Sequence, residues 1–279
     1  MLRYQVKDLV NIGAREFRET IDHFLRLRDH KSEGYASAAR QRDLSVQFHW
    51  GHHHDFGDFV VEGPNGNNHI GLIKAFTEEM HALPRSLSGL KVLDIGCWTG
   101  GTSLLLNAMG AHVMAVEEVK KYVDCLAYLK HAFDLPRIEP RNLSLYECTT
   151  PEFQDAFDYI LFCGVLYHVS DPIVALRITF NCLQDGGTCL IESAVTPSAD
   201  MVLSYEGPSV VWAGREEDMN RRGWNWFMPS PRALAQMMTD VGYSDVQIVP
   251  PPPGRTFAFG KRRSHVDMLR AGLSARSIR

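Results

Sequence analysis

The residues best suited to chemistry lie in residues 92–101, which read VLDIGCWTGG. Asp94 lies in an apolar, β-branched run that is typical of a buried strand, and glycines follow this run at once. Gly96 and Gly100 allow the backbone to approach a ligand where a Cβ would collide. A carboxylate beside a glycine turn that opens a helix, here over residues 102–108, predicts a nucleotide cradle.

The glycine spacing differs from the dinucleotide-binding pattern G-x-G-x-x-G. The middle glycine of that pattern falls on Trp98, whose side chain would deny a pyrophosphate its close backbone contact. The spacing therefore argues against a dinucleotide ligand. The residues that we predict to contact the nucleotide here are Asp94, Gly96, Cys97, Trp98 and Gly100.

A second acid, Glu117, ends the next predicted strand, residues 112–117. The two oxygens of a carboxylate at this place suit both hydroxyls of a ribose. We therefore predict Glu117 as the ribose ligand. Glu118 takes that role if the strand ends one residue later.

A third strand is predicted over residues 142–148, after a crossover helix over residues 119–133. In a nucleotide-binding fold of this order, the adenine lies beside the end of the third strand. Its position alone therefore predicts adenine contacts from Cys148 and Thr149.

A fourth strand over residues 157–164 is almost continuously apolar, as expected of a parallel strand covered on both faces. Its end at Cys163 is predicted to lie at the ligand edge, and Tyr167 and His168 follow. We expect Tyr167 to lie at the same edge. His168 is a candidate general base, because an acidic acceptor benefits from a base within hydrogen-bond reach. The competing candidates are His49, His52, His53, His54 and Glu206, and a further alternative is that placement of the acceptor suffices without a dedicated base.

The remaining elements complete an α/β fold. Pro172 begins a helix after Asp171, and a fifth strand covers residues 187–195. A second helix, capped by Ser230 and Gly242, covers residues 230–241. A hairpin then joins strands over residues 243–249 and 256–260. This order predicts a doubly wound, mostly parallel, seven-stranded sheet. Its ligand lies over the carboxyl ends of the strands.

Two motifs resemble a known family. Residues 94–100 resemble motif I of the class I S-adenosylmethionine-dependent methyltransferases, D/E-x-G-x-G-x-G, with Trp98 in place of the central glycine. The F-D-x-I and G-V-L-Y-H segments over residues 157–168 resemble the branch that contains the bacterial tRNA wobble-uridine carboxymethyltransferase and related small-molecule methyltransferases. The likeness covers about residues 91–260 and implies a Rossmann-like methyltransferase.

The resemblance also bears on the cofactor. In that branch, a tyrosine and an arginine hold the carboxylate of carboxy-S-adenosylmethionine, and Tyr167 and Arg255 match them. Two further lysines of the branch have no clear counterpart, because Lys31 comes too early and Lys74 lies in a predicted helix. A buried carboxylate without its partner costs about a few kcal/mol. S-adenosylmethionine is therefore favoured over its carboxylated form.

The region before the glycine turn contains clustered histidines. An amphipathic helix is predicted over residues 14–27, short strands and turns over residues 48–63, and a further helix over residues 70–83. Adjacent residues on an extended chain point to opposite faces, so consecutive histidines do not converge on one metal ion. We predict no metal site, and expect His49 and His53 to line the acceptor pocket.

Residues 196–228 form a long connection for a compact α/β domain and contain many aromatic side chains. Long insertions at a ligand edge serve as lids or binding loops, and the alternative is a small apolar cluster that secures the loop. The acceptor contacts predicted here are Tyr205, Trp212 and Trp226, to which we add Arg255.

Composition sets the remaining limits. The chain has 279 residues, 45% of them hydrophobic, and a net charge of −4 that disfavours broad attraction to nucleic acid. Its six cysteines form no C-x-x-C pair, and we find no segment apolar enough to span a bilayer, so we expect reduced thiols in a cytoplasmic protein. The predicted regions are a cap over residues 1–88, a cofactor domain over 89–262 and a basic tail over 263–279.

These observations predict a methyltransferase that uses S-adenosylmethionine and acts on an oxygen, nitrogen or carbon of a small molecule. Two alternatives stay open. One is a tRNA wobble-uridine methyl- or carboxymethyltransferase, disfavoured by the acidic charge and the missing lysines. The other is a non-catalytic nucleotide-binding module, suggested by Trp98. The sequence also leaves a homo-oligomer open.

Overall fold

The computed structural model describes residues 51–55, 60–61, 65–133, 135–206, 225–249 and 254–264. The predicted helix over residues 14–27, the predicted acceptor residues His49 and Trp212, and nearly all of the basic tail lie outside the described residues. The chain divides into two compact units, Met1–Ser144 and Leu145–Arg279. The predicted cap and tail boundaries stay predictions.

The predicted doubly wound, mostly parallel, seven-stranded sheet is confirmed, with the strand order β10-β11-β7-β6-β3-β4-β5. The first unit contributes parallel strands β3 (Lys91–Ile95), β4 (His112–Glu117) and β5 (Ile138–Asn142). The second unit contributes β6 (Phe157–Cys163) and β7 (Leu183–Ala194), which are parallel, then β10 (Ser244–Val249) and β11 (Arg255–Lys261). β11 runs antiparallel to both β7 and β10, which confirms the closing hairpin.

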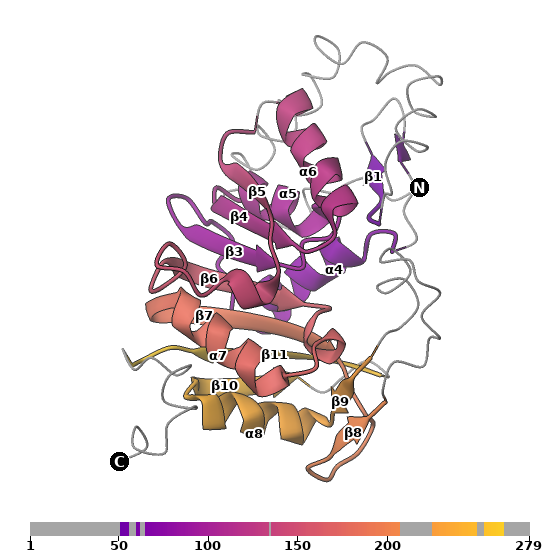
Figure 1. Ribbon diagram of the computed structural model, residues 1–279, viewed down its shortest axis with the longest axis vertical. Helices are drawn as coiled ribbons and strands as arrows, with labels where there is room; N and C mark the ends of the chain where they lie inside the picture. The colour runs from indigo at the N-terminus through magenta and orange to yellow at the C-terminus, as the bar shows by residue number, and fades with distance from the viewer. Residues whose placement is uncertain are drawn as a thin grey trace. The chain divides into compact units, whose positions relative to one another are not determined.

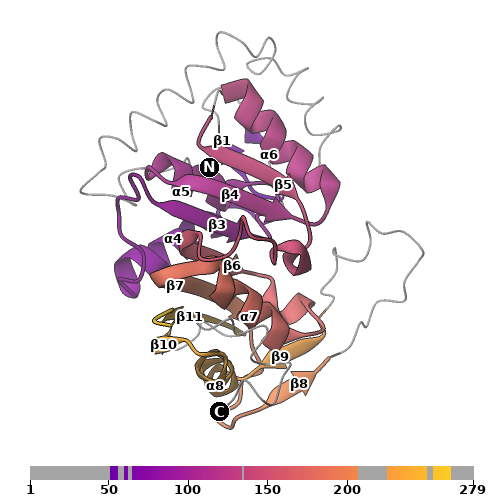
Figure 2. The same ribbon diagram turned by 60° about the vertical axis from the view of Figure 1, so that its left-hand side comes forward.

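The helices of the first unit cover its strands. Helix α5 (Gly101–Ala108) is buried along its whole length, and α6 (Lys120–Phe133) packs along β4 and β5 (Figures 1 and 2). Helix α4 (Asn68–Lys74) packs against α5 and continues as a π-helical turn, η1 (Ala75–Glu79). A short hairpin of β1 (His54–Asp55) and β2 (Val60–Val61) confirms the predicted short strands.

The predicted boundaries of one helix and one strand are wrong. The helix predicted over residues 70–83 ends earlier, because His81 has a φ of +51° and Pro84 follows. The third strand is β5, not residues 142–148, which instead include a 3₁₀ turn, η2 (Leu145–Glu147). β5 lies at the sheet edge, where Pro140 and an ion pair between Arg141 and Glu139 are tolerated, so it lacks the apolar pattern of its neighbours.

The second unit has two long helices. Helix α7 (Pro172–Cys182) begins at Pro172, as predicted, and α8 (Pro231–Val241) packs against β10 (Figure 2). Ser230 accepts the amide of Ala233, and Gly242 has a φ of +117°, so both predicted caps of α8 are confirmed. Strand β7 begins at Leu183, earlier than the predicted strand over residues 187–195.

The ends of the predicted insertion over residues 196–228 form a small antiparallel pair, β8 (Leu203–Tyr205) and β9 (Phe227–Pro229). All six cysteines are free, and Cys163 alone among them is not buried. None of the described helices has the length and apolarity to cross a membrane.

Candidate functional site

The turn between β3 and α5 uses left-handed backbone repeatedly. Gly96 and Gly100 have φ values of +72° and +88°, and Trp98 adopts +49° although it carries a side chain. A Cβ on Gly100 would overlap the side chain of Leu126 in α6. Gly100 is therefore required by its φ and by packing on α6, in addition to any approach of a ligand.

Most backbone amides of this turn are already hydrogen-bonded within the chain. Gly96 N and Cys97 N donate to Val116 O at 2.8 and 3.2 Å, and Gly100 N donates to Cys97 O at 2.9 Å. Two further amides donate to side chains. Trp98 N donates to Glu117 Oε2 at 3.1 Å, and Gly101 N donates to His52 Nδ1 at 3.1 Å. A dinucleotide pyrophosphate is held by unpaired amides at such a turn. The paired amides therefore support the prediction that the ligand is not a dinucleotide.

Asp94 anchors the start of α5 to β3. Its Oδ2 accepts the hydroxyls of Thr102 and Ser103 at 2.6 and 2.7 Å, and the side chain is buried. Burial raises the pKa of Asp94 to about 6, although these two hydrogen bonds lower it. The geometry therefore gives Asp94 a structural task at the turn, and its predicted contact with a cofactor stays a prediction.

Glu117 is held by two backbone amides at the end of β4. Its Oε2 accepts Trp98 N, and its Oε1 accepts Val119 N at 2.9 Å. Burial raises the pKa of Glu117 to about 7, although these hydrogen bonds lower it. A carboxylate has about four acceptor positions in all, so the two bonds leave Glu117 with capacity to accept a further hydroxyl.

The alternative acid, Glu118, is exposed and lies beyond the end of β4. Asn142 Nδ2 donates to the carbonyls of Glu117 and Glu118 at 2.9 and 2.8 Å, which fixes the backbone where β4 ends. The structure therefore favours Glu117 over Glu118 as the ribose ligand. Sequence reasoning missed the part played by Asn142, because it depends on pairing between β4 and β5.

Sequence reasoning also missed His52 as a partner of the turn. His52 is buried, and burial lowers its pKa to about 4. Its ring lies 4.7 Å from the ring of His69 and 5.3 Å from Trp98, centroid to centroid. His53, which we predicted to line the acceptor pocket, is half-buried, and its amide donates to Gly66 O. The run of histidines marked this segment as a candidate site, but the sequence does not indicate which histidine is buried.

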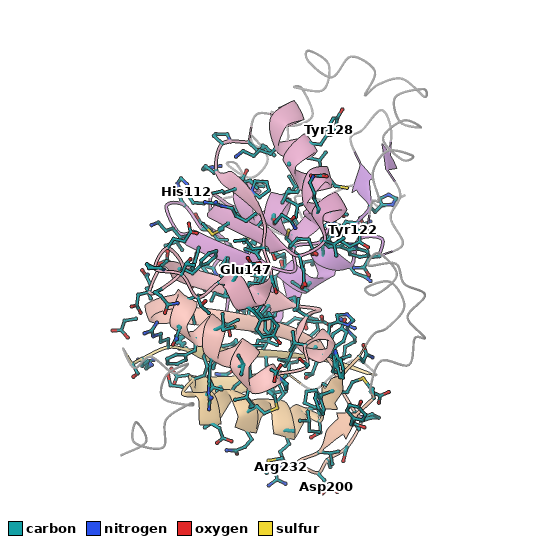
Figure 3. The ribbon with its side chains drawn as sticks, in the orientation of Figure 1. His112, Tyr122, Tyr128, Glu147, Asp200 and Arg232 are labelled. Carbon is teal, nitrogen blue, oxygen red and sulfur yellow. The ribbon has the colours of Figure 1, made fainter. Side chains whose placement is uncertain are left out.

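Trp98 lies between aromatic neighbours. Its ring is 6.0 Å from that of Tyr122, which lies in the first turn of α6 (Figure 3). A Cβ on Gly51 would overlap the indole of Trp98. Trp98 therefore packs against residues before the turn and after it, and its left-handed backbone is held by these contacts.

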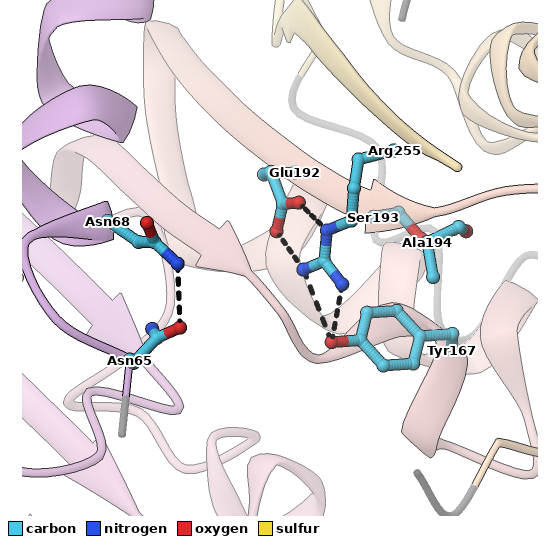
Figure 4. A network of polar contacts seen from close by, with 7 residues as sticks. All are labelled: Asn65, Asn68, Tyr167, Glu192, Ser193, Ala194 and Arg255. Carbon is cyan, nitrogen blue, oxygen red and sulfur yellow. Dashed lines mark hydrogen bonds and ion pairs between the residues drawn. The ribbon is translucent and has the colours of Figure 1, made fainter. Parts of the chain in front are cut away.

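In the second unit, the predicted site residues Tyr167 and Arg255 form a polar network with Glu192 (Figure 4). Arg255 in β11 donates from Nε and Nη2 to the two oxygens of Glu192 in β7, the Nη2 bond being 2.8 Å. Both Nη atoms also donate to Tyr167 Oη at 3.3 Å. Although burial opposes the charge of Arg255, its hydrogen bonds to Glu192 raise its pKa, so the guanidinium stays charged. Sequence reasoning missed Glu192, because its partner lies on a neighbouring strand and only the pairing of β7 with β11 brings the two together.

Tyr167 lies in a 3₁₀ turn, η3 (Leu166–His168), with its side chain buried. Burial raises the pKa of the Tyr167 phenol, and Arg255 opposes this rise. The ring of His168 lies 4.1 Å from the ring of Tyr167, and Trp226 N donates to Tyr167 O at 2.8 Å. The structure therefore brings Tyr167, His168, Trp226 and Arg255 together.

The other predicted site residues of this unit lie outside the hydrogen-bond network of Tyr167, Glu192 and Arg255. Tyr205 is 65% exposed and lies 5.5 Å from the ring of Phe227. Cys148 is fully buried, with its carbonyl 3.3 Å from Cys182 Sγ, and Thr149 beside it is exposed. Cys163 is half-buried at the end of β6. The adenine and acceptor roles of these residues stay predictions.

No group of three or more histidine, cysteine or acidic side chains able to hold a metal ion occurs within the part of the chain that the structure describes. His49 lies outside those residues, and the expectation of no metal site stays a prediction.

Comparison with protein families gives one matching domain. The family model for a methyltransferase domain matches residues 70–248. Among curated relatives, the tRNA U34 carboxymethyltransferase of Methylococcus capsulatus is 30% identical over 173 residues, covering 61% of this chain and 49% of the relative. The corresponding protein of Desulfotalea psychrophila is 27% identical over 163 residues, covering 58% and 48%. The chain spans about half the length of these curated relatives.

Solved structures share the fold. The N-terminal domain of EvdMO1, crystallised in the presence of SAH and D-fucose, has a TM-score of 0.58 at 14% sequence identity. The match covers 80% of this chain and 95% of that chain. At this identity, the likeness supports the fold alone.

Proposed function

Because the chain belongs to the methyltransferase-domain family, we propose that it is an S-adenosylmethionine-dependent methyltransferase that acts on a small molecule. The observation that carries this proposal is Glu117, whose carboxylate ends β4 beside the glycine turn and keeps acceptor capacity beyond its bonds to Trp98 N and Val119 N. This arrangement suits the two hydroxyls of a ribose. The paired amides of the turn suit a nucleoside without a pyrophosphate.

When bound, S-adenosylmethionine supplies a methyl group on a positively charged sulfur. The acceptor atom forms a bond to the methyl carbon as the carbon–sulfur bond breaks, and an O–H or N–H acceptor loses its proton. The chain must hold the acceptor in line, since correct placement supplies most of the rate in such a displacement. His168 is our candidate to receive the proton.

Tyr167 has a different role from His168 in the proposed reaction. Its raised pKa keeps the phenol neutral at pH 7, so it cannot serve as a base. Arg255 donates two N–H groups to its oxygen, and these occupy the phenol lone pairs. The phenol hydrogen is therefore directed away from Arg255, and Tyr167 acts as a hydrogen-bond donor that orients a bound group.

A tRNA U34 carboxymethyltransferase is the second candidate. Curated relatives with that name favour it, as does the pair of Tyr167 and Arg255. Against it stand the net charge of −4 and the pairing of Arg255 with Glu192, which leaves a neutral pair for an incoming carboxylate. Tight binding of carboxy-S-adenosylmethionine, together with a shift of tRNA on a gel, would favour this candidate over ours.

Calorimetry with the purified protein tests the proposed function. We expect binding of both S-adenosylmethionine and its demethylated product, S-adenosylhomocysteine. A mass-spectrometric survey of metabolites that gain one methylene unit then identifies the acceptor. Binding of neither nucleoside would contradict the proposal, and binding of both without any methylated product in the survey would favour the non-catalytic module.

A further inference from the structure

The proposed function does not explain the histidine segment, residues 51–55, which reads GHHHD. This segment docks on the turn between β3 and α5 through buried polar contacts. Gly51 N and His52 N donate to Thr99 Oγ1 at 3.1 and 3.0 Å, and Gly101 N donates to His52 Nδ1 at 3.1 Å. Residues far apart in the sequence thus share one hydrogen-bond network at the first turn of α5.

The network specifies the protonation of His52. Because Nδ1 accepts the amide of Gly101, it carries no hydrogen, and a neutral imidazole then carries its hydrogen on Nε2. Thr99 Oγ1 accepts the two amides of the segment and lies 3.2 Å from Nδ1, so its hydroxyl hydrogen and the Gly101 amide share the single lone pair of Nδ1. A side chain without an acceptor at this position would leave the buried amide of Gly101 unpaired.

Shape also joins the two segments. Gly51 lies directly under the indole of Trp98, where a Cβ would overlap the ring. Gly101 lies under His52 and His69, and its Cβ would come within 2.7 Å of His52 Cγ. Each segment therefore provides a glycine that receives an aromatic ring of the other.

We propose that the histidine segment belongs to the cofactor-binding apparatus and that His52 is the positioning residue that holds the glycine turn in its binding form. This inference rests on the proposed function. His52 contacts the indole of Trp98, and the amide of Trp98 holds Glu117. His52 thus acts on the predicted ribose ligand through Trp98.

Paired variants of His52 provide the test. In His52→Asn, the amide oxygen can take the place of Nδ1 and accept from Gly101, whereas His52→Leu removes the acceptor. We expect His52→Leu to weaken S-adenosylhomocysteine binding about tenfold in calorimetry, and His52→Asn to stay within about twofold of the wild type. An unchanged Kd for His52→Leu would overturn the inference.

The control is His112→Leu, which alters an exposed histidine at the start of β4 in the same unit (Figure 3). It should leave the Kd unchanged. A Kd that also rises in His112→Leu would show that the assay responds to any lost histidine, and it would overturn the assignment to His52.

A second pair covers the case in which His52→Leu does not fold. Thr99→Val keeps the side-chain shape but removes the hydroxyl, and Thr99→Ser keeps the hydroxyl. We expect Thr99→Val to raise the Kd and the KM for the cofactor without lowering kcat at saturation, and Thr99→Ser to resemble the wild type. A role limited to folding would lower the Tm and leave the Kd of the folded protein unchanged, which would overturn the inference.

The two proposals fail in distinguishable ways. If the wild-type protein binds neither S-adenosylmethionine nor S-adenosylhomocysteine, the proposed function is wrong. If the wild type binds both and the variants at His52 and Thr99 bind equally well, the proposed function stands and the histidine segment has no part in it.

Discussion

The two regions that contain the predicted site residues hold their acids in opposite ways. In the first unit, Glu117 is held by backbone amides, with no cation paired to it among the described residues, and burial raises its pKa to about 7. In the second unit, Glu192 is held by the charged guanidinium of Arg255. Loss of either charged partner breaks the ion pair directly, whereas the amides that hold Glu117 belong to the backbone. A substitution at Glu192 or Arg255 therefore acts on the second region directly, and a substitution at His52 acts on the first region only through the position of the glycine turn.

Glu117→Ala should have the largest effect. It removes the proposed acceptor for the ribose hydroxyls and leaves the amides of Trp98 and Val119 without this partner. We expect the affinity for S-adenosylhomocysteine to fall about a hundredfold in calorimetry. Glu118→Ala, at the exposed neighbour, is the matched control. Equal effects of the two variants would reverse our choice between these acids.

The pH dependence of cofactor affinity should follow Glu117. In the proposed role its ionised form accepts the ribose hydroxyls, and with a pKa of about 7 it takes up a proton as the pH falls. The Kd of S-adenosylhomocysteine should therefore rise below pH 7, by up to about tenfold per pH unit. Glu117→Gln should abolish this dependence. Because the pKa is raised from 4.5, the same group should make the free protein less stable as the pH rises from 4.5 to 7.

Glu192→Ala tests the second region. It frees Arg255, which then no longer holds the oxygen of Tyr167 in place. We expect kcat to fall about tenfold through lost orientation, with little change in the Kd of S-adenosylhomocysteine. A loss of affinity matching that of Glu117→Ala would remove the distinction between the regions. Glu192→Gln, which keeps one acceptor for Arg255, should have a smaller effect.

Tyr167→Phe should have a smaller effect again. It removes the hydroxyl that Arg255 contacts but keeps the ring beside His168. We expect kcat to fall about fivefold, the value of one neutral hydrogen bond, with an unchanged Tm. A lower Tm with unchanged kcat would show that the hydroxyl serves folding instead of turnover.

Ser230→Ala is expected to change stability alone. Ser230 Oγ accepts the amides of Ala233 and Val202 and donates to the carbonyl of Asp200. Loss of this helix cap should lower the free energy of unfolding by about 1 kcal/mol in a denaturant titration. Cofactor affinity should not change. A change in affinity would mean that the cap of α8 also shapes the binding site.

Local patterns predicted much of this molecule. The strand that contains Asp94, the helix after Gly100 and the caps of α8 depend on apolar runs and turn residues, which act within a few positions of the chain. β5 was misplaced because an edge strand needs no apolar face, so Pro140 and its charged neighbours gave no strand signal.

The sequence by itself determined the fold class, the glycine turn, and the succession of Asp94 and Glu117 at the ends of neighbouring strands. Only the tertiary structure decided that His52 pairs with Gly101, that Trp98 holds Glu117, and that Glu192 pairs with Arg255. The physical reason is sequence separation. Periodicity and turn chemistry act locally, whereas hydrogen bonds between distant segments depend on how the whole chain packs.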